Sequence, residues 1–163
     1  MPLAPPITDI EQLKDRPAVA ALLSWNKDAV RGVRFDRGEL SIWVAREFIR
    51  EACLQLKDRG VANFLSDLTC ADYYPRVPRF ELAYQLLSHQ RKEFVRLKVS
   101  LDGEDAVAES ITSVWPAANF FEREIFDLFG VRFLGHPNLR RIMLPESWEG
   151  HPLRKDYPVE GYR

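Results

Sequence analysis

The chain has 163 residues, with 23 basic and 24 acidic side chains and a formal net charge of −1. This length predicts one domain and is sufficient for a hydrophobic core without disulfide support. The near-neutral charge argues against nucleic-acid binding, which depends largely on positive charge. The only cysteines, Cys53 and Cys70, exclude a disulfide framework and any cysteine-ligated iron–sulfur or zinc site held within this chain alone.

The sequence carries no membrane or secretion signal that we can identify. No apolar run approaches the roughly 20 residues of a membrane-spanning helix. The first six residues, Met-Pro-Leu-Ala-Pro-Pro, contain neither a basic segment nor an apolar core typical of a secretory signal. We therefore expect a soluble, cytoplasmic chain that contacts a membrane only through a partner.

The first part of the chain alternates helical and strand patterns. Pro17 favours a helix start and predicts a helix over 17–24. A turn signal at 36–38 lies between two alternating segments and predicts a β-hairpin. Apolar residues at helical spacing then predict a helix over 46–57, which Gly60 ends.

Three strand-like segments follow, at 64–73, 80–87 and 94–101. Apolar and polar residues alternate in the second and third, which indicates strands with one face on a core and one on solvent. The order helix, two strands, helix, three strands predicts an α+β fold, a mixed sheet with helices packed on it. We assign 1–104 to this α+β domain and 105–163 to a C-terminal helix and an extended irregular tail in the same compact unit.

The C-terminal helix is predicted over 116–129, between a proline that can begin it and Gly130, which can end it. At about 100° per residue, Glu122 falls inside the apolar arc of this helix. A carboxylate buried there must be paired or hydrogen-bonded, because an unpaired buried charge is costly. The other charged side chains of the helix share the opposite side: Arg123, Glu124 and Asp127.

The tail from 131 to 163 has no helical or strand period, and its four prolines exclude a regular helix or a central strand. It is nevertheless too apolar for a solvated disordered segment. An irregular segment of this length within a compact chain usually has a function. We expect another molecule to cover it.

His136 and His151 each precede a proline within a short internal repeat of Gly-His-Pro. One interpretation is a metal or acid–base pair, since histidine binds metals and titrates near neutral pH. Together with Glu122 or Glu124, such a pair would define a small stand-alone, metal-dependent enzyme. The favoured alternative is that each ring hydrogen-bonds locally in a turn, because no third ligand stands at a suitable spacing.

Glu122, Glu124 and Asp127 could also act as paired carboxylates in acid–base catalysis. A hydrolase is disfavoured, because the chain lacks a nucleophile elbow, and it has neither a glycine-rich phosphate loop nor a dinucleotide fingerprint. Ion pairing is the favoured use of these carboxylates, because basic residues are abundant nearby: Arg123, Arg140, Arg141, Arg154 and Lys155.

The run Glu-Arg-Glu-Ile-Phe-Asp-Leu-Phe-Gly at 122–130, continued by His-Pro-Asn-Leu-Arg-Arg-Ile at 136–142, resembles a family signature. The family is that of the C subunit, also called the 30 kDa subunit, of NADH-quinone oxidoreductase, respiratory complex I. Residues 145–158 look like the family's C-terminal segment. Asp72-Tyr73-Tyr74 and residues 79–86 are similar to its central strands, so the resemblance extends from about residue 40 to Pro158.

The resemblance implies a non-catalytic scaffold subunit in the hydrophilic arm of a proton-translocating complex. That complex transfers electrons from NADH through FMN and iron–sulfur clusters to quinone. The resemblance also implies that other subunits hold the FMN and the clusters. It further implies that this chain contacts the D subunit, which contains the quinone site, and the iron–sulfur subunits. Such a chain is peripheral, on the cytoplasmic side of the inner membrane.

An alternative within this resemblance is the equivalent subunit of a related membrane complex with another electron donor, of the ferredoxin, deazaflavin or hydrogenase type. In either case, we expect the helix over 116–129 to anchor an ion-pair network that fixes the start of the tail. The tail from His136 to Tyr157 then binds the quinone-site subunit, since apolar side chains and arginine suit an interface. The candidate residues for the network and the interface are Glu122, Arg123, Glu124, Asp127, His136, Arg140, Arg141, Trp148, His151, Arg154, Lys155, Asp156 and Tyr157.

Overall fold

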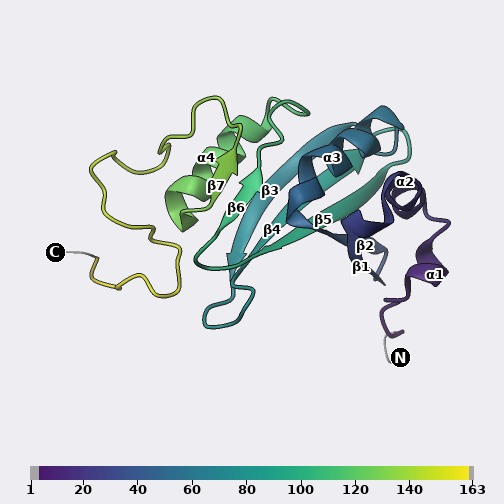
Figure 1. Cartoon of the computed structure of the whole chain (residues 1–163), viewed down its shortest axis with the longest axis horizontal. Coiled ribbons are helices and arrows are strands. Elements are labelled where there is room, and N and C mark those ends of the chain that lie inside the picture. Colours follow the sequence, from purple (N-terminus) through teal and green to yellow (C-terminus); the bar gives the residue numbers. More distant parts are fainter. Residues whose placement is uncertain (1–3, 162–163) are drawn as a thin grey trace.

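The computed structural model describes residues 4–161. The prediction that the first six residues are not a secretory signal falls partly on residues 1–3, which lie outside the described residues. The helices are α1 (Ile10–Leu13), α2 (Pro17–Trp25), α3 (Ile49–Asp58) and α4 (Ala118–Phe129). The strands are β1 (Val30–Asp36), β2 (Glu39–Val44), β3 (Phe64–Asp72), β4 (Phe80–Ser88), β5 (Glu93–Leu101), β6 (Val107–Glu109) and β7 (Arg132–Leu134). Short 3₁₀ turns occupy Lys27–Ala29 and Arg46–Phe48. Figure 1 shows how these elements follow one another.

Five strands form one sheet in the order β1-β2-β5-β4-β3. β2 and β5 are parallel, whereas the other neighbouring pairs are antiparallel. β5, the last of these strands in sequence, thus lies between β2 and β4, and its Leu97 pairs with Ile42 of β2. The predicted α+β class and the mixed sheet are confirmed.

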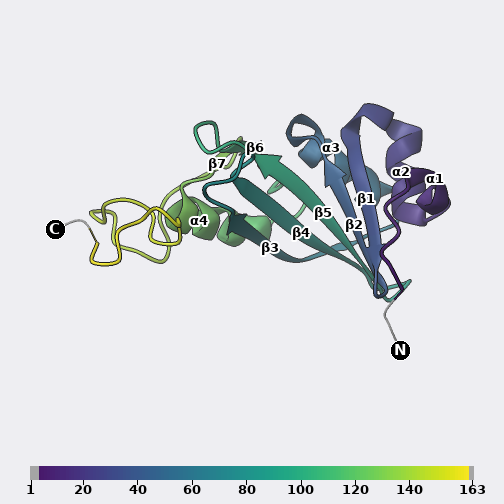
Figure 2. The ribbon, with the colours of Figure 1, turned by 90° about the horizontal axis from the view of Figure 1, so that it is seen from below.

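Alternation in the strands determines which face of the sheet is buried. In β4 the residues at even positions are buried, among them Phe80, Leu82 and Tyr84, and the residues between them are partly exposed. Helices α2 and α3 cover the apolar face, as Figures 1 and 2 show. The other face is polar, and there Glu81 accepts hydrogen bonds from Trp43 and Lys98.

Helix α4 packs against β3 at one end of the molecule, and the tail extends from it away from the sheet (Figure 1). Gly130 ends the helix with a φ of +76°, a conformation that glycine adopts without steric cost. β6 and β7 flank the helix in sequence and pair in parallel. β7 is not a central strand, since it pairs with β6 in a sheet of two strands, and its three residues are too few to show a period in the sequence.

The prediction of one helix over 46–57 also needs correction, because the chain forms a 3₁₀ turn first and the α-helix begins at Ile49. The hairpin at 36–38 is confirmed. Among the residues that the structure describes, no helix has both the length and the apolar character needed to cross a membrane.

Candidate functional site

The carboxylate of Asp127 is the centre of the contacts between α4 and the tail. Its side chain is fully buried. Oδ2 accepts hydrogen bonds from the backbone N–H groups of Ile142, Met143 and Leu144, at 3.0, 2.8 and 2.9 Å. Oδ1 accepts from Nη1 of Arg141 at 2.6 Å. One helix side chain thus fixes the conformation of four consecutive tail residues.

These contacts keep Asp127 ionised. Burial by itself raises the pKa of Asp127, but the hydrogen bonds from Leu144 and Arg141 outweigh it and leave the pKa below its usual value. The sequence placed Asp127 on the side of the helix opposite the apolar arc and favoured an ion pair for it, and Arg141 supplies that pair. Asp127 is buried because the tail folds over that side.

Arg141 and Arg123 attach further parts of the tail to this centre. Nη2 of Arg141 donates to the carbonyl groups of Trp148 and Gly150, at 3.0 and 2.9 Å. Arg123 donates to the carbonyl groups of Arg140 and Arg141, at 3.2 and 3.1 Å. Both guanidinium groups therefore hold tail backbone in place.

The tail also supplies donors for the carbonyl groups at the end of α4, residues 127–129, which have no partner within the helix. The donors are Nδ1 of His151, the N–H of Leu153 and Nε of Arg154, at 2.9, 3.0 and 2.6 Å. Because a carbonyl oxygen only accepts, Nδ1 of His151 carries a proton here. Burial lowers the pKa of His151, which favours the neutral ring.

A second attachment joins the tail to the sheet. Nε and Nη2 of Arg79 donate to the carboxylate of Asp72 at 2.9 and 2.8 Å. Nη1 and Nη2 of the same guanidinium donate to Asp156 at 2.9 and 2.6 Å. The N–H of Lys155 donates to Asp72 at 2.9 Å. Burial opposes ionisation of Asp72, but the hydrogen bonds, first from Arg79, bring its pKa to about 2.

Glu122 connects α4 to a different segment. Its carboxylate is fully buried and accepts hydrogen bonds from the Ser110 hydroxyl at 2.6 Å and from the N–H of Ile111 at 2.7 Å. The prediction that a buried Glu122 must be hydrogen-bonded is confirmed. Burial raises its pKa to about 7, although both hydrogen bonds act in the opposite direction.

The predicted ion-pair network around α4 was wrong in its composition. Within residues 4–161, Glu122, Arg123 and Glu124 form no ion pair, and only Asp127 does. Glu124 is exposed. Helical spacing defines the faces of a helix, but it does not show which backbone groups of a distant segment approach each face.

The two histidines of the tail lie at opposite ends of α4. Nε2 of His136 contacts the carbonyl oxygen of Asn119, and Nδ1 accepts from the N–H of Asn138. His151 contacts Asp127, eight residues further along the helix, a rise of about 12 Å. This separation is too large for one metal ion. Within the described part of the chain, no group of three histidine, cysteine or acidic residues is arranged to hold a metal.

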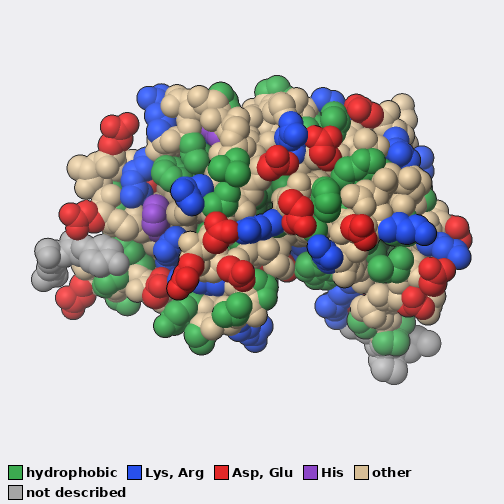
Figure 3. Space-filling view, viewed as in Figure 1, with side chains coloured by type: hydrophobic (Ala, Val, Ile, Leu, Met, Phe, Trp, Pro, Cys, Tyr) green, Lys and Arg blue, Asp and Glu red, His purple; other side chains and the backbone are tan. Residues whose placement is uncertain are grey.

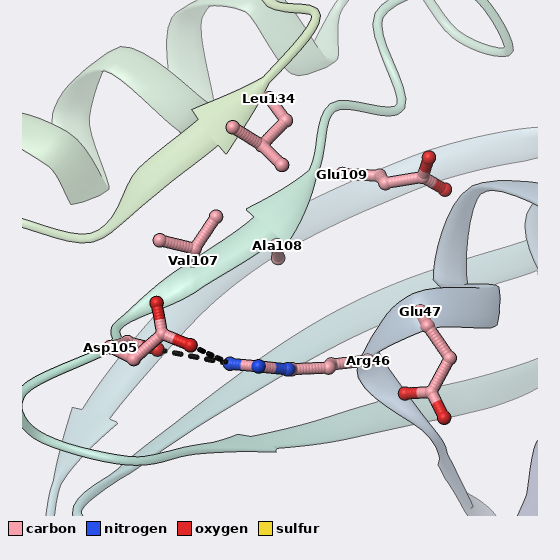
Figure 4. Close-up of a pocket in the computed structure, with 7 residues that line it drawn as sticks. All are labelled: Arg46, Glu47, Asp105, Val107, Ala108, Glu109 and Leu134. Carbon is pink, nitrogen blue, oxygen red and sulfur yellow. Dashed lines mark hydrogen bonds and ion pairs between the residues drawn. The ribbon is translucent and has the colours of Figure 1, made fainter.

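A pocket of about 370 Å³ lies between the 3₁₀ turn Arg46–Phe48 and the β6–β7 pair (Figure 4). An ion pair of 2.7 Å between Arg46 and Asp105 crosses one side of it. Its apolar lining comes from Val107, Ala108 and Leu134. None of the predicted site residues lines this pocket.

The outward side of the tail is apolar at several positions. Met143, Leu153 and Trp148 are 63%, 49% and 42% exposed. Figure 3 shows apolar side chains at the surface among charged ones over the half of the molecule that carries α4 and the tail. Arg140, Lys155 and Asp156 are also exposed. The hydroxyl of Tyr157, which is half-buried, donates to the carbonyl of Glu149.

Sequence reasoning missed four residues that hold the structure around α4 and the tail: Asp72, Arg79, Ser110 and Ile111. Asp72 lies at the end of β3 and accepts the N–H of Tyr74 at 2.9 Å, as a turn-forming acid does. No local sequence pattern indicated the contacts of Asp72 with Arg79 and with the tail.

Cys53 and Cys70 are buried, as is typical of small core residues, and burial raises the pKa of both thiols.

Residues 42–163 match the family described as respiratory-chain NADH dehydrogenase, 30 Kd subunit. The NADH-quinone oxidoreductase C subunit of Roseiflexus sp. (strain RS-1) is 46% identical over 134 residues, which cover 81% of this chain and 77% of the relative. The protein of the same name from Geobacter sulfurreducens is 42% identical over 134 residues, which cover 82% of this chain and 83% of the relative.

Two solved structures are similar to this chain. A trypsin-resistant fragment (1-134) of Nqo5 is 36% identical with a TM-score of 0.58, and the match covers 63% of this chain and 83% of the fragment. A chain of the membrane-bound sulfane sulfur reductase, an archaeal respiratory membrane complex, has a TM-score of 0.70 at 22% identity, over 92% of this chain and 84% of that one. The second likeness shows the fold alone. The family match and the identity to curated relatives together show that this chain belongs to the respiratory-chain NADH dehydrogenase 30 kDa subunit family.

Proposed function

We propose that this chain is a non-catalytic scaffold subunit in the hydrophilic arm of a proton-translocating NADH-quinone oxidoreductase. Relatives that are 42–46% identical over most of the chain carry the name of that enzyme's C subunit, which supports the proposal. In this proposal, other subunits hold FMN, the iron–sulfur clusters and the quinone site. The chain is peripheral, on the cytoplasmic side of the inner membrane.

The tail from His136 to Tyr157 binds the quinone-site subunit in this proposal, and the iron–sulfur subunits are further neighbours. The observation that carries it is the buried carboxylate of Asp127, which fixes the backbone of residues 142–144 while Met143 is exposed. A segment fixed in shape before it binds loses little conformational entropy at an interface. Exposed apolar side chains on such a segment favour burial against another protein.

We further propose a division of roles between the two parts of the chain. Residues 1–104 form the supporting α+β domain, and residues 105–163 form the partner-binding part of the same compact unit. Asp127, Arg141, Arg123, His151 and Arg154 hold the tail on α4. The outward side chains that would meet the partner include Arg140, Met143 and Trp148.

A second candidate is the equivalent subunit of a related membrane complex that uses another electron donor. The observation in its favour is the shared fold with a chain of the sulfane sulfur reductase complex, at a TM-score of 0.70. The donor is bound by other subunits in both cases. Identifying whether an NADH- and FMN-binding subunit accompanies this chain therefore distinguishes the two.

Site-specific photo-crosslinking in the assembled complex tests the tail's partner. A photoreactive residue at Met143 is expected to capture the quinone-site subunit. A matched control at Glu11, exposed on α1 at the other end of the molecule, is expected not to capture it. Absence of the quinone-site subunit from the products at position 143 would contradict the proposal.

A further inference from the structure

The loop between β3 and β4 exposes apolar side chains next to the end of the tail. Val77 is 85% exposed, Tyr74 is 53% exposed and Tyr73 is 42% exposed. Single exposed apolar residues are normal on a protein surface, but a cluster at one loop indicates a contact surface. Figure 1 shows this loop projecting from the sheet on the side where the tail returns.

Loop and tail form one continuous surface because Arg79 joins them. Its guanidinium bridges Asp72, at the end of β3, and Asp156 in the tail. The N–H of Lys155 binds the same Asp72 carboxylate. The Arg79 guanidinium also lies 5.0 Å from the ring of Tyr74, so it contacts the loop as well as the tail. A partner that covers the end of the tail therefore reaches the loop without a gap.

The charged side chains considered on this surface carry a net charge of +1, because Arg76, Arg79 and Lys155 face two carboxylates, Asp72 and Asp156. Asp72 and Asp156 are both paired with Arg79. Arg76, at the exposed turn of the loop, has its guanidinium 6.0 Å from the centre of the Tyr73 ring. Among the described residues, neither Arg76 nor the exposed Lys155 side chain forms an ion pair. Positive charge beside apolar side chains is complementary to an apolar recess bordered by carboxylates.

We propose that the loop 73–78 inserts into an apolar recess bordered by acidic groups on the same neighbouring protein that binds the tail. This inference rests on the proposed function and extends its interface from the tail to the sheet. Val77 and Tyr74 fill the recess, and Arg76 pairs with its acidic border. Tyrosine and arginine are the residue types that carry much of the binding energy in protein interfaces.

Crosslinking from two positions in the assembled complex tests the inference separately from the proposed function. Photoreactive residues at Val77 and at Met143 are expected to capture one and the same neighbour. Capture from 143 with no product from 77, or with a different neighbour from 77, would overturn the inference and leave the proposed function intact. No capture from either position would contradict both.

Charge reversal gives a second, independent test. Arg76→Glu is expected to weaken retention of the chain in the complex roughly tenfold, with a smaller loss at high salt than at low salt. The control is Arg91→Glu, an exposed arginine in the turn between β4 and β5 at the opposite end of the sheet. Equal effects of the two variants would overturn the inference.

Discussion

Asp127 and Arg141, fourteen residues apart in sequence, form an ion pair of 2.6 Å between a fully buried carboxylate and a nearly buried guanidinium. The same carboxylate binds the three backbone N–H groups that follow Arg141. A charged side chain of α4 thus takes the place of secondary structure in the tail. This relationship explains how a segment without helix or strand keeps a defined shape.

Replacing Asp127 with asparagine should release the tail. The amide cannot pair with the Arg141 charge and offers one acceptor oxygen where the carboxylate offers two. Removing one partner of a buried ion pair costs about 3 kcal/mol, so we expect that loss in the free energy of unfolding. We also expect faster hydrogen exchange at residues 142–144. Glu124→Gln, an exposed change on the same helix, should alter neither, and unchanged exchange in Asp127→Asn would contradict the assignment.

Glu122 should make the stability of the chain depend on pH near neutrality. Its folded pKa of about 7 is higher than the ordinary value of 4.5, so its contribution is fully present below pH 4.5 and is lost as the pH rises through 7. The loss amounts to about 3 kcal/mol, since each pKa unit corresponds to about 1.4 kcal/mol. Urea unfolding at pH 5 and pH 8 measures it.

The control for this effect is Glu122→Gln. A glutamine can accept the N–H of Ile111 and donate to the Ser110 hydroxyl, but it does not titrate. The wild-type protein should therefore lose stability relative to this variant between pH 5 and pH 8. Burial lowers the pKa of His136 and of His151, and their contributions cancel in the comparison because both proteins contain them. Parallel stability profiles would show that Glu122 is not the group responsible.

Gly130→Ala should displace the tail from the end of α4. A Cβ atom at Gly130 would lie 2.6 Å from the His151 ring and 2.7 Å from Nη2 of Arg154. Gly60 also has a positive φ, +66°, but a Cβ atom there meets nothing within 4 Å. Both substitutions carry a backbone cost of about 1 kcal/mol, so a larger loss of stability in Gly130→Ala measures the contact with the tail. Equal losses in thermal unfolding would contradict it.

Arg79→Lys should loosen the end of the tail while keeping the positive charge. A lysine cannot bridge the two carboxylates of Asp72 and Asp156 with paired donors. We expect faster exchange of the Lys155 amide and higher sensitivity to proteolysis at 154–157. Arg46→Lys is the matched control, because its ion pair with Asp105 is exposed to solvent, which screens it.

The elements that depend on local pattern could be predicted from the sequence. Alternation in 80–87 and 94–101 indicated the central strands, and the apolar arc of α4 indicated the burial of Glu122. The insertion of β5 between β2 and β4 could not be predicted, because it depends on pairing between distant segments. For the same reason, the burial of Asp127 was missed. Helical spacing shows on which face of α4 Asp127 lies, but only the folded structure shows that the tail covers that face.

Purification of the tagged full-length chain from its native membrane tests the proposed scaffold role most directly. We expect the quinone-site subunit, the iron–sulfur subunits and an NADH- and FMN-binding subunit to co-purify with it in equal amounts. The scaffold role would be contradicted if the chain purified as a monodisperse protein without any of these subunits and showed enzymatic activity on its own.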